Sequence, residues 1–375
     1  MGLQKLLERI GLVGGRQGEV AVRAVQQAEP ASEDLSDGGP VPDATIPAAV
    51  EAALERGDAV GAVDLLAEAN RRNPSGGLEM ALVDLRHAAA GLLSPAERAP
   101  WPPSYADPFP GLVGEPPSID ARDLGVEVLG GAVAYHGCLV VRDLFTGAQI
   151  SAALEAIRNA EARRSAPGSE TSADRWYRPF PSANAADRGL RQMVARHGGT
   201  WLADSPASCA RVLDDLAASG AIDAIAAHFG DRPLISLQKS TLRRSAPVFN
   251  FAGWHQDGSF LGPEVRAMNV WVALTPCGGD RRTPGMELVP RRVDEILPTD
   301  GGLGSASISD ATVLRAAQGT PRIHPAFEAG DAMLFDERFL HRTHLTPDME
   351  DERYALECWF FAPAHSSDRY VSFLV

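Results

Sequence analysis

The chain has 375 residues, more than one compact domain of ordinary size needs, so we expect one large catalytic unit with an appendage, or two domains. Hydrophobic residues make up 45% and charged residues 22%, which excludes a disordered, collagen-like or disulfide-scaffold chain. With 35 Lys+Arg against 49 Asp+Glu, the formal net charge of −14 argues against nucleic acid or an anionic membrane as the main partner.

The four cysteines, Cys138, Cys209, Cys277 and Cys358, lie far apart and form no CxxC pair, so neither a zinc knuckle nor a thioredoxin-type motif is present. Reduced thiols are typical of the cytoplasm, and we expect that location. No run approaches the roughly 18 apolar residues that a membrane span requires. The amphipathic first residues lack the continuous apolar stretch of a secretory signal.

The N-terminal part predicts a tail followed by helices. Residues 1–45 are polar and end in a Gly/Pro-rich piece, which predicts a flexible tail behind one short helix. Within residues 46–94 apolar residues recur at helical spacing, with breaks at Gly57-Asp58 and Pro74-Ser75, so we expect two or three short helices. Part of this segment weakly resembles one tetratricopeptide-like hairpin, but no second copy follows. A plain helical extension that packs on the main domain is favoured.

A proline-rich connector separates this extension from the main domain, residues 118–375. Residues 95–117 contain eight of the 28 prolines, and proline removes backbone donors and fixes φ. Residues 137–142 then predict a strand. Thr146 and Gln149 stand at capping-box spacing ahead of an apolar-periodic helix.

The second half of the chain changes from helices to strands. Residues 165–200 are rich in Ser, Ala, Arg and Gly and predict a long loop region, and helices are expected around residues 207–218 and 221–229. From Leu234 onward, short strand-like runs alternate with Gly, Pro and Asp, as in an antiparallel sandwich or barrel. We therefore predict an α+β fold in which helices precede a β-barrel.

The most informative stretch is WHQDGSFLG at residues 254–262. In an extended strand, residues two apart face the same way, so His255 and Asp257 present an imidazole and a carboxylate together. A third metal ligand must come from another strand, and His341 in GDAMLFDERFLHRTH is the natural candidate. Two histidines and one carboxylate leave three open positions, the arrangement typical of non-haem Fe(II) oxygenases. His344 is the rival, on the opposite face if the strand continues.

The open positions can take a bidentate 2-oxo acid and dioxygen. A 2-oxo acid with a distal carboxylate also needs a cation deep in the barrel, and Arg353 follows His341 at the start of the last strand. The planar fork of arginine meets a carboxylate with two parallel hydrogen bonds. The alternative is that Arg353 is a surface arginine beside the acidic run at residues 349–352.

For several polar residues, the sequence is compatible with two roles. The strand over residues 238–244 is polar on both faces, so the pocket is lined either by Gln238, Ser240 and Arg244 or by Lys239, Thr241 and Arg243. The arginine pairs at 243–244, 281–282 and 291–292 either receive an anionic group or are solvated. We predict that the remaining histidines lie at the surface or in packing: His87, His136, His197, His228, His324 and His365.

The string HQDG, the hydrophobic strand with Trp271, the block GDAMLFDERFLHRT and the following Arg353 resemble the phytanoyl-CoA dioxygenase family of Fe(II)/2-oxoglutarate-dependent oxygenases. The resemblance covers roughly residues 130–363. It implies a double-stranded β-helix, a jelly-roll or cupin-like barrel, in which His255, Asp257 and His341 bind Fe(II) and Arg353 binds 2-oxoglutarate. It favours His341 over His344. Trp271 and Gln256 match positions that often flank the co-substrate.

Residues 282–292 depart from the family pattern, because the Asn-Gly and the Ser-His around its VxPGSH segment are missing. The substrates of relatives therefore do not transfer. The resemblance implies a dioxygenase that uses O2 to hydroxylate a small-molecule substrate and releases succinate and CO2, and Asp257 disfavours a halogenase. The alternative is a non-catalytic cupin-like barrel that binds a small ligand or sugar, with the N-terminal helices as an interaction module.

Overall fold

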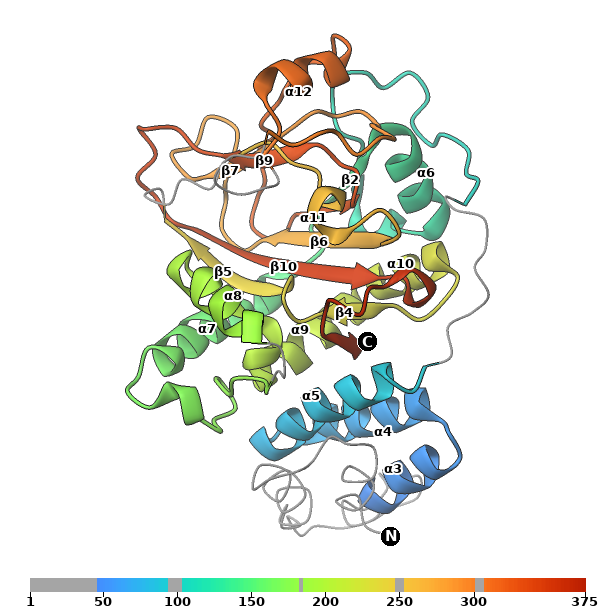
Figure 1. Ribbon diagram of the computed structural model, residues 1–375, viewed down its shortest axis with the longest axis vertical. Coiled ribbons are helices and arrows are strands. Elements are labelled where there is room, and N and C mark those ends of the chain that lie inside the picture. The colour runs from blue at the N-terminus through green and yellow to red at the C-terminus, as the bar shows by residue number, and fades with distance from the viewer. Residues whose placement is uncertain (1–45, 94–102, 182–184, 247–252, 301–306) are drawn as a thin grey trace.

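The computed structural model describes residues 46–93, 103–181, 185–246, 253–300 and 307–375. Along the longest axis of the molecule, three N-terminal helices lie at one end and a two-stranded sheet lies toward the other, with a nine-stranded sheet between them (Figure 1). The fold is α+β, as predicted. The tail at residues 1–45 and the first part of the proline-rich connector lie outside the described residues.

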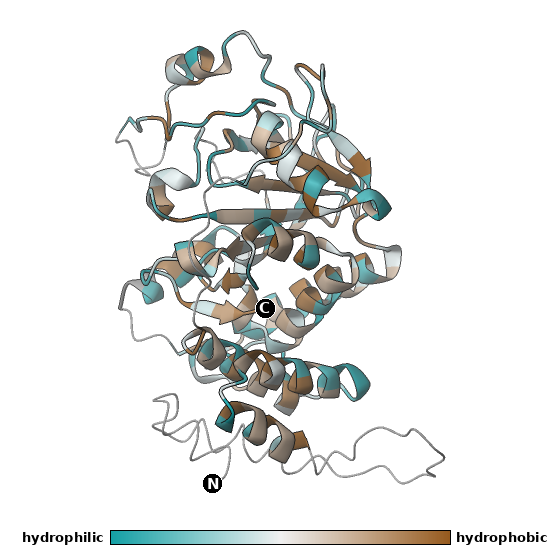
Figure 2. Ribbon diagram, turned by 90° about the vertical axis from the view of Figure 1, so that its right-hand side faces the viewer, coloured by the Kyte–Doolittle hydropathy of each residue, from teal (hydrophilic) through white to brown (hydrophobic). Residues whose placement is uncertain are grey.

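The N-terminal helices begin and end at the predicted breaks. They are α3 (Ile46–Glu55), α4 (Ala59–Arg72) and α5 (Gly76–Ala90). The side chain of Asp58 accepts a hydrogen bond from the Gly61 amide and caps α4, and Ser75 caps α5 in the same way. Figure 2 shows brown and teal segments along each helix, the alternation of an amphipathic helix.

The helical extension packs directly on the rest of the chain. Leu82, Leu85 and Ala89 of α5 are buried, and α5 contacts α9 (Pro206–Ala218) and β11 (Ser372–Leu374). A guanidinium nitrogen of Arg86 donates to the Leu374 carbonyl at 2.8 Å, which ties the helix to the C-terminal strand.

Past the connector, the chain forms a strand–helix–strand unit. The residues from 103 to 117 contain no helix or strand, as the prolines predict. The elements that follow are β1 (Ser118–Asp120), η2 (Ala121–Asp123), α6 (Val126–His136), β2 (Cys138–Arg142) and α7 (Gly147–Arg164). The predicted capping box of Thr146 and Gln149 is present at the start of α7.

The predicted long loop at residues 165–200 is partly wrong. After η3 (Ser169–Thr171), the helix α8 (Ala185–Arg196) and the strand β3 (Gly199–Trp201) fall within it. The apolar residues of α8 recur at helical spacing, but the surrounding Ser, Ala, Arg and Gly obscure that short pattern. The helices that follow match the prediction: after η4 (Leu202–Asp204) come α9 and α10 (Ala221–Phe229).

The large sheet has the order β1-β2-β8-β6-β10-β4-β11, with β5 paired to β10 and β3 paired to β5. Its other strands are β4 (Leu234–Ser236), β5 (Thr241–Ser245), β6 (Ala267–Ala273), β8 (Ala332–Asp336) and β10 (Arg353–Phe361). The central pair, β6 and β10, is antiparallel over seven residue pairs. The one strand predicted over residues 234–244 is split by a turn at residues 237–240.

Both faces of the large sheet are buried. Met268, Val270 and Val272 of β6 pack in one cluster with apolar residues of α6, α7, α9 and α10. The alternate residues Trp271 and Ala273 point to the other face. Helices therefore cover one face of this sheet and leave the other for the site.

The small sheet lies over that second face. In it β7 (Gly285–Leu288) pairs antiparallel with β9 (His341–His344), and a bridge between His255 and His341 extends the pairing. The pairings of the described residues do not join the two sheets into a closed barrel. The short elements near it are α11 (Gly258–Leu261), α12 (Asp310–Ala317) and η5 (Pro363–His365).

Two further predictions concern the thiols and the membrane. All four cysteines are buried and free of disulfide bonds. Among the residues described here, no helix combines the length and the apolar character that crossing a bilayer demands.

Candidate metal centre

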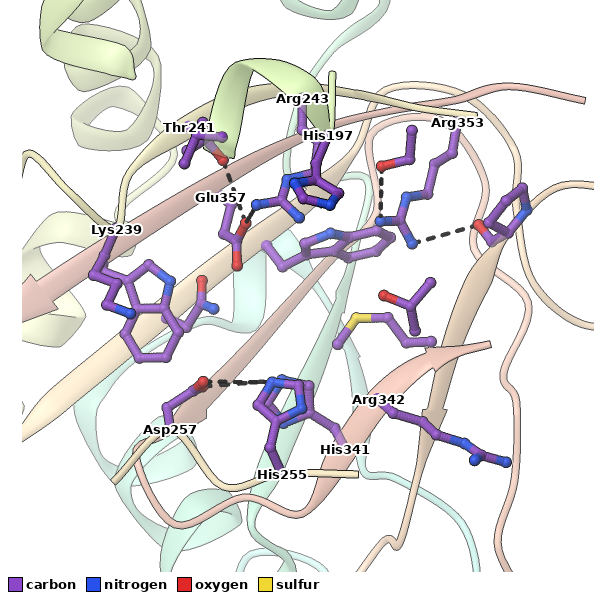
Figure 3. Close-up of a pocket in the computed structure, with 18 of the residues that line it drawn as sticks. His197, Lys239, Thr241, Arg243, His255, Asp257, His341, Arg342, Arg353 and Glu357 are labelled. Atoms are coloured by element: carbon purple, nitrogen blue, oxygen red, sulfur yellow. Dashed lines mark hydrogen bonds and ion pairs between the residues drawn. The ribbon is translucent and has the colours of Figure 1, made fainter. Parts of the chain in front are cut away.

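A cavity of about 300 Å³ lies between the two sheets (Figure 3). Its walls come from β5, β6 and β10 of the large sheet and from β7 and β9 of the small sheet. Met193 and Val194 of α8 and the following His197 also line it. His197 lies at the surface, as predicted, but it also contributes to the cavity wall, together with part of the segment expected to be a loop.

The candidate ligands His255, Asp257 and His341 meet in this cavity. One ligand atom from each lies within 4.8 Å of the others. The Nε2 atom of His255 is 3.6 Å from Oδ1 of Asp257, and Nε2 of His341 is 3.9 Å from Oδ2. Figure 3 shows both rings directed toward the carboxylate. No other such group of three ligating side chains occurs in the part of the chain that the structure describes.

The local backbone explains this convergence differently from the sequence argument. His255 and His341 exchange two backbone hydrogen bonds, of 3.0 and 3.1 Å, which set the two imidazoles side by side. Asp257 has helical dihedrals, φ −66 and ψ −27, and is the N-cap residue that precedes α11. The expectation that His255 and Asp257 project from one extended strand is therefore wrong. A turn after His255 brings the carboxylate to the imidazoles.

Gln256 holds that turn in place. Its side chain is fully buried, its Nε2 donates to the carbonyls of Glu295 and Arg338, and its Oε1 accepts from the Leu297 amide. Gln256 does not line the cavity. The expectation that it flanks the co-substrate is wrong, because its amide group is occupied by the backbone behind the site.

Backbone carbonyls orient both candidate imidazoles. Nδ1 of His255 lies 2.9 Å from the Gly253 carbonyl, and Nδ1 of His341 lies 3.0 Å from the Phe339 carbonyl. A carbonyl only accepts, so Nδ1 carries the proton and Nε2 presents its lone pair to the cavity. Burial lowers the pKa of both imidazoles, and that of His341 falls well below its ordinary value. Both rings are therefore neutral ligands at neutral pH.

The Asp257 carboxylate is suited to bind a cation because it is buried and its Oδ2 has no hydrogen-bond partner among the described residues. Burial raises the pKa of Asp257 well above its ordinary value, because a bare carboxylate is unfavourable in a dry site. A divalent cation would offset that penalty. Two neutral nitrogens and one oxygen without a partner match the donor set of non-haem Fe(II) sites.

His344 does not join this group. Its ring stacks on His324 with the centroids 4.3 Å apart, and its Nδ1 lies 3.9 Å from a carboxylate oxygen of Glu287. His344 is three residues beyond His341, so it lies on the other face of β9. The structure thus brings His341 rather than its rival to His255 and Asp257.

Arg353 lies in the same cavity and is 4% exposed, so the surface alternative is wrong. Its Nη1 donates to the Gly285 carbonyl at 2.9 Å, and its Nη2 donates to Oγ of Ser245 at 3.4 Å. The guanidinium carbon lies 5.4 Å from the ring centroid of Trp271, which also lines the cavity. Within the described residues, no carboxylate pairs with Arg353.

The choice between the two faces of residues 238–244 is now decided. Lys239, Thr241 and Arg243 line the cavity, together with Gln238 at the turn before β5. Ser240 points away and accepts from the Trp359 amide at 3.0 Å. Lys239, Thr241 and Arg243 thus share one face, as alternation requires, and only Gln238, in the turn ahead of β5, departs from it.

The remaining arginine pairs bind protein groups. Arg244 forms ion pairs with Glu161 and Glu352, and Arg292 pairs with Asp336. Arg281 and Arg282 pair with Glu328 and Glu350. These side chains therefore do not form an open anion site.

Glu357 is a cavity residue that the sequence argument missed. Its carboxylate accepts from Thr241 at 3.3 Å and pairs with Arg243 at 3.1 Å (Figure 3). It stands four residues after Arg353 on the same strand, and a period of two places both on one face. That spacing is a signal that finds Glu357 once Arg353 is taken to face the cavity.

The comparison with protein-family models matches residues 134–346 to the model described as phytanoyl-CoA dioxygenase. This match spans more than half of the chain. The chain belongs to the phytanoyl-CoA dioxygenase family. The matched residues include all three candidate ligands and end before Arg353. Among curated proteins, the comparison finds no match.

The chain is also similar to several solved structures. AviO1 from Streptomyces viridochromogenes Tue57 is 16% identical, with a TM-score of 0.40 over 63% of this chain and 94% of that chain. The non-heme alpha ketoglutarate dependent carbocyclase SnoK from nogalamycin biosynthesis is 15% identical, with a TM-score of 0.42 over 64% and 85%. EctD from S. alaskensis with 2-oxoglutarate and 5-hydroxyectoine is 17% identical, with a TM-score of 0.41 over 61% and 73%.

Proposed function

We propose that this family member is an Fe(II)- and 2-oxoglutarate-dependent dioxygenase that hydroxylates a small organic substrate with O2 and releases succinate and CO2. One observation carries the proposal. Two imidazole nitrogens and a buried carboxylate oxygen without a partner converge in the same cavity as Arg353, a buried cation without a carboxylate partner. Family membership agrees with this assignment.

His255, Asp257 and His341 are the residues that would hold Fe(II). When bound, the iron supplies the activation of O2 that is coupled to decarboxylation of the 2-oxo acid. The chain contributes the arrangement of its ligands: the carbonyls of Gly253 and Phe339 fix the two imidazoles, and Gln256 fixes the turn that carries Asp257. Rigid orientation of ligands by such contacts is a general property of metal sites.

Arg353 is the proposed partner of the distal carboxylate of 2-oxoglutarate. Its guanidinium is held by the Gly285 carbonyl and lies near the ring of Trp271, so the fork is positioned before the co-substrate binds. A planar fork suits a carboxylate, and a positioned fork loses less freedom on binding. Trp271 is the proposed neighbouring wall of the co-substrate pocket.

The same proposal extends to the architecture. We assign the two facing sheets to a double-stranded β-helix and residues 118–375 to the oxygenase domain. Residues 46–94 serve as a helical cover that contacts α9 and β11, and residues 95–117 connect the two. A cytoplasmic location stays a prediction.

A non-catalytic sugar- or ligand-binding barrel is the competing function, and one experiment separates the two. Anaerobic protein receives Fe(II) and then 2-oxoglutarate, and we expect a visible charge-transfer absorbance. On exposure to 18O2, a screen of small acids, sugars and lipids should give succinate in proportion to a product that carries one labelled hydroxyl. Binding of neither Fe(II) nor 2-oxoglutarate would contradict the proposal, and labelled succinate without labelled product from any compound would contradict hydroxylation.

A further inference from the structure

The chain uses arginine almost exclusively as its cation. Of its 35 basic residues only two are lysines, Lys5 and Lys239. Lys5 lies outside the described residues, whereas Lys239 lines the cavity that holds the candidate ligands. Lysine differs from arginine in being a compact charge on a flexible stem, without a planar fork. Lys239 is therefore the single lysine after residue 5, and it lines the cavity. All the other basic residues after residue 5 are arginines.

Two aromatic rings flank the Lys239 ammonium. Its Nζ lies 3.8 Å from the ring centroid of Phe260 and 5.9 Å from that of Tyr370. Among the described residues, no carboxylate forms an ion pair with it. Ring faces attract a cation but carry no net charge, so they do not balance it. Burial lowers the pKa of Lys239, and the nearby carboxylate of Asp257 opposes this effect.

The other charges of the cavity already have counterparts. Glu357 pairs with Arg243. In the proposed function, the carboxylate of Asp257 and the two carboxylates of 2-oxoglutarate together balance a divalent cation and Arg353. Lys239 then remains as a largely buried positive charge without a counter-charge, which is unfavourable unless an anion joins it.

We propose that Lys239 binds a carboxylate of the substrate, and hence that the substrate of this chain is a small carboxylic acid. This inference rests on the proposed function. Figure 3 shows Lys239 on the Asp257 side of the cavity and Arg353 on the opposite side, so the two cations bind different anions. The carbon to be hydroxylated lies between the Lys239 ammonium and the metal position.

Calorimetric titration tests whether the cavity selects an anion. The protein is loaded with Mn(II), saturated with 2-oxoglutarate, and titrated with benzoate, hexanoate and N-acetylglycinate and with the primary amide of each acid. We expect at least one acid to bind about tenfold or more tightly than its amide, as a charge-assisted hydrogen bond predicts. That preference should disappear in Lys239→Gln. It should persist in Arg369→Gln, a control that removes one positive charge from the exposed residue next to Tyr370.

Lysine acetylation gives an independent readout. Since Lys239 is the one lysine beyond residue 5, acetylation with an N-hydroxysuccinimide ester followed by peptide mass spectrometry reports on a single cavity amine. We expect Mn(II) and 2-oxoglutarate alone to change its acetylation rate by no more than about twofold, whereas the preferred acid slows it about tenfold and its amide does not. A purely structural Lys239 would show no difference between acid and amide.

The outcomes separate this inference from the proposed function. If the wild-type protein binds neither Mn(II) nor 2-oxoglutarate, the proposed function fails. If it binds both, but no acid binds more tightly than its amide or protects Lys239, only the role of Lys239 is overturned. Full protection by Mn(II) and 2-oxoglutarate without any acid also overturns it, because Lys239 then binds the co-substrate. Weaker binding of 2-oxoglutarate by Lys239→Gln would also overturn the role of Lys239, because it would show that Lys239 binds the co-substrate.

Discussion

Two of the regions that hold buried charges differ in how those charges are paired: the cavity between the sheets, and the seam where α4 and α5 meet the rest of the fold. In the seam, Arg178 pairs with Asp84 at 2.6 Å and Arg175 pairs with Glu79 at 2.5 Å. In the cavity, and among the described residues, Oδ2 of Asp257 has no hydrogen-bond partner and Arg353 binds only neutral groups. The two seam pairs join opposite charges within the chain, whereas Asp257 and Arg353 are left for ligands.

This contrast has a physical basis. A buried charge without a charged partner is costly, so one that lines a cavity is a candidate to bind a ligand of opposite charge. In the seam, removal of one residue of an ion pair should therefore reduce the stability of the fold and leave ligand binding intact. In the cavity, removal of a side chain should abolish binding and leave the fold intact. Four predictions test this division.

The largest effect is expected for His341→Ala. Loss of one of three protein ligands should abolish tight Fe(II) binding and 2-oxoglutarate turnover, while the unfolding transition stays cooperative. Metal content after desalting and the charge-transfer absorbance measure this directly. His344→Ala is the matched control, since His344 stacks on His324 outside the group. Full activity in His341→Ala with loss in His344→Ala would reverse the assignment.

The next effect concerns Arg353 and 2-oxoglutarate. Arg353→Ala should weaken 2-oxoglutarate binding by about 3–5 kcal/mol, a hundredfold or more, because the distal carboxylate loses its buried partner. Arg353→Lys keeps the charge without the fork, and should give an intermediate loss. Titration of the anaerobic Fe(II) protein with 2-oxoglutarate measures both. An unchanged midpoint in Arg353→Ala would contradict the role of this residue, and Fe(II) affinity should stay the same in both variants.

The two regions also differ in how far the sequence reveals them. The spacing of His255, His341 and Arg353 along strand-like runs predicts a shared cavity, and the structure places the three side chains there. The breaks at Gly57-Asp58 and Pro74-Ser75 likewise predict the ends of the N-terminal helices. Local signals of this kind depend on backbone geometry that neighbouring residues determine.

The features that the sequence does not reveal depend on contacts between distant segments. Gln256 has the residue type of a pocket group, but the carbonyls of Glu295 and Arg338 turn it away from the cavity. Residues 238–244 are polar on both faces, so the sequence does not reveal that Lys239 rather than Ser240 faces the cavity. The pairing of Arg178 with Asp84 joins residues 94 positions apart and leaves no local pattern.

In the seam, Asp84→Ala should lower the free energy of unfolding by about 2 kcal/mol, because it leaves the buried Arg178 with only the Met80 carbonyl at 3.4 Å. Urea denaturation measures the loss. Glu68→Ala is the control, since its pairs with Arg71 and Arg72 are exposed and should contribute far less to stability. Fe(II) and 2-oxoglutarate affinities should not change. A loss of Fe(II) affinity in Asp84→Ala would show that the seam supports the site directly.

The smallest effect is a pH dependence at the junction between the connector and α10. His228 is buried, stacks on Tyr105 of the connector and lies 3.1 Å from its hydroxyl. Burial lowers the pKa of His228 to about 4. The unfolded chain binds a proton below about pH 6.5 and the folded chain does not, so this residue reduces stability as the pH falls from 6.5 toward 4.

Between pH 7.5 and pH 5.5 the contribution of His228 to the loss of stability should be about 1 kcal/mol. Urea denaturation of the wild-type protein and of His228→Gln at both pH values isolates it, because the other titrating groups are common to both. The variant should lose about 1 kcal/mol less than the wild type over this interval. An equal loss would mean that His228 takes up a proton in the folded chain. The junction would then be more open to water than the seam that α5 forms with α9.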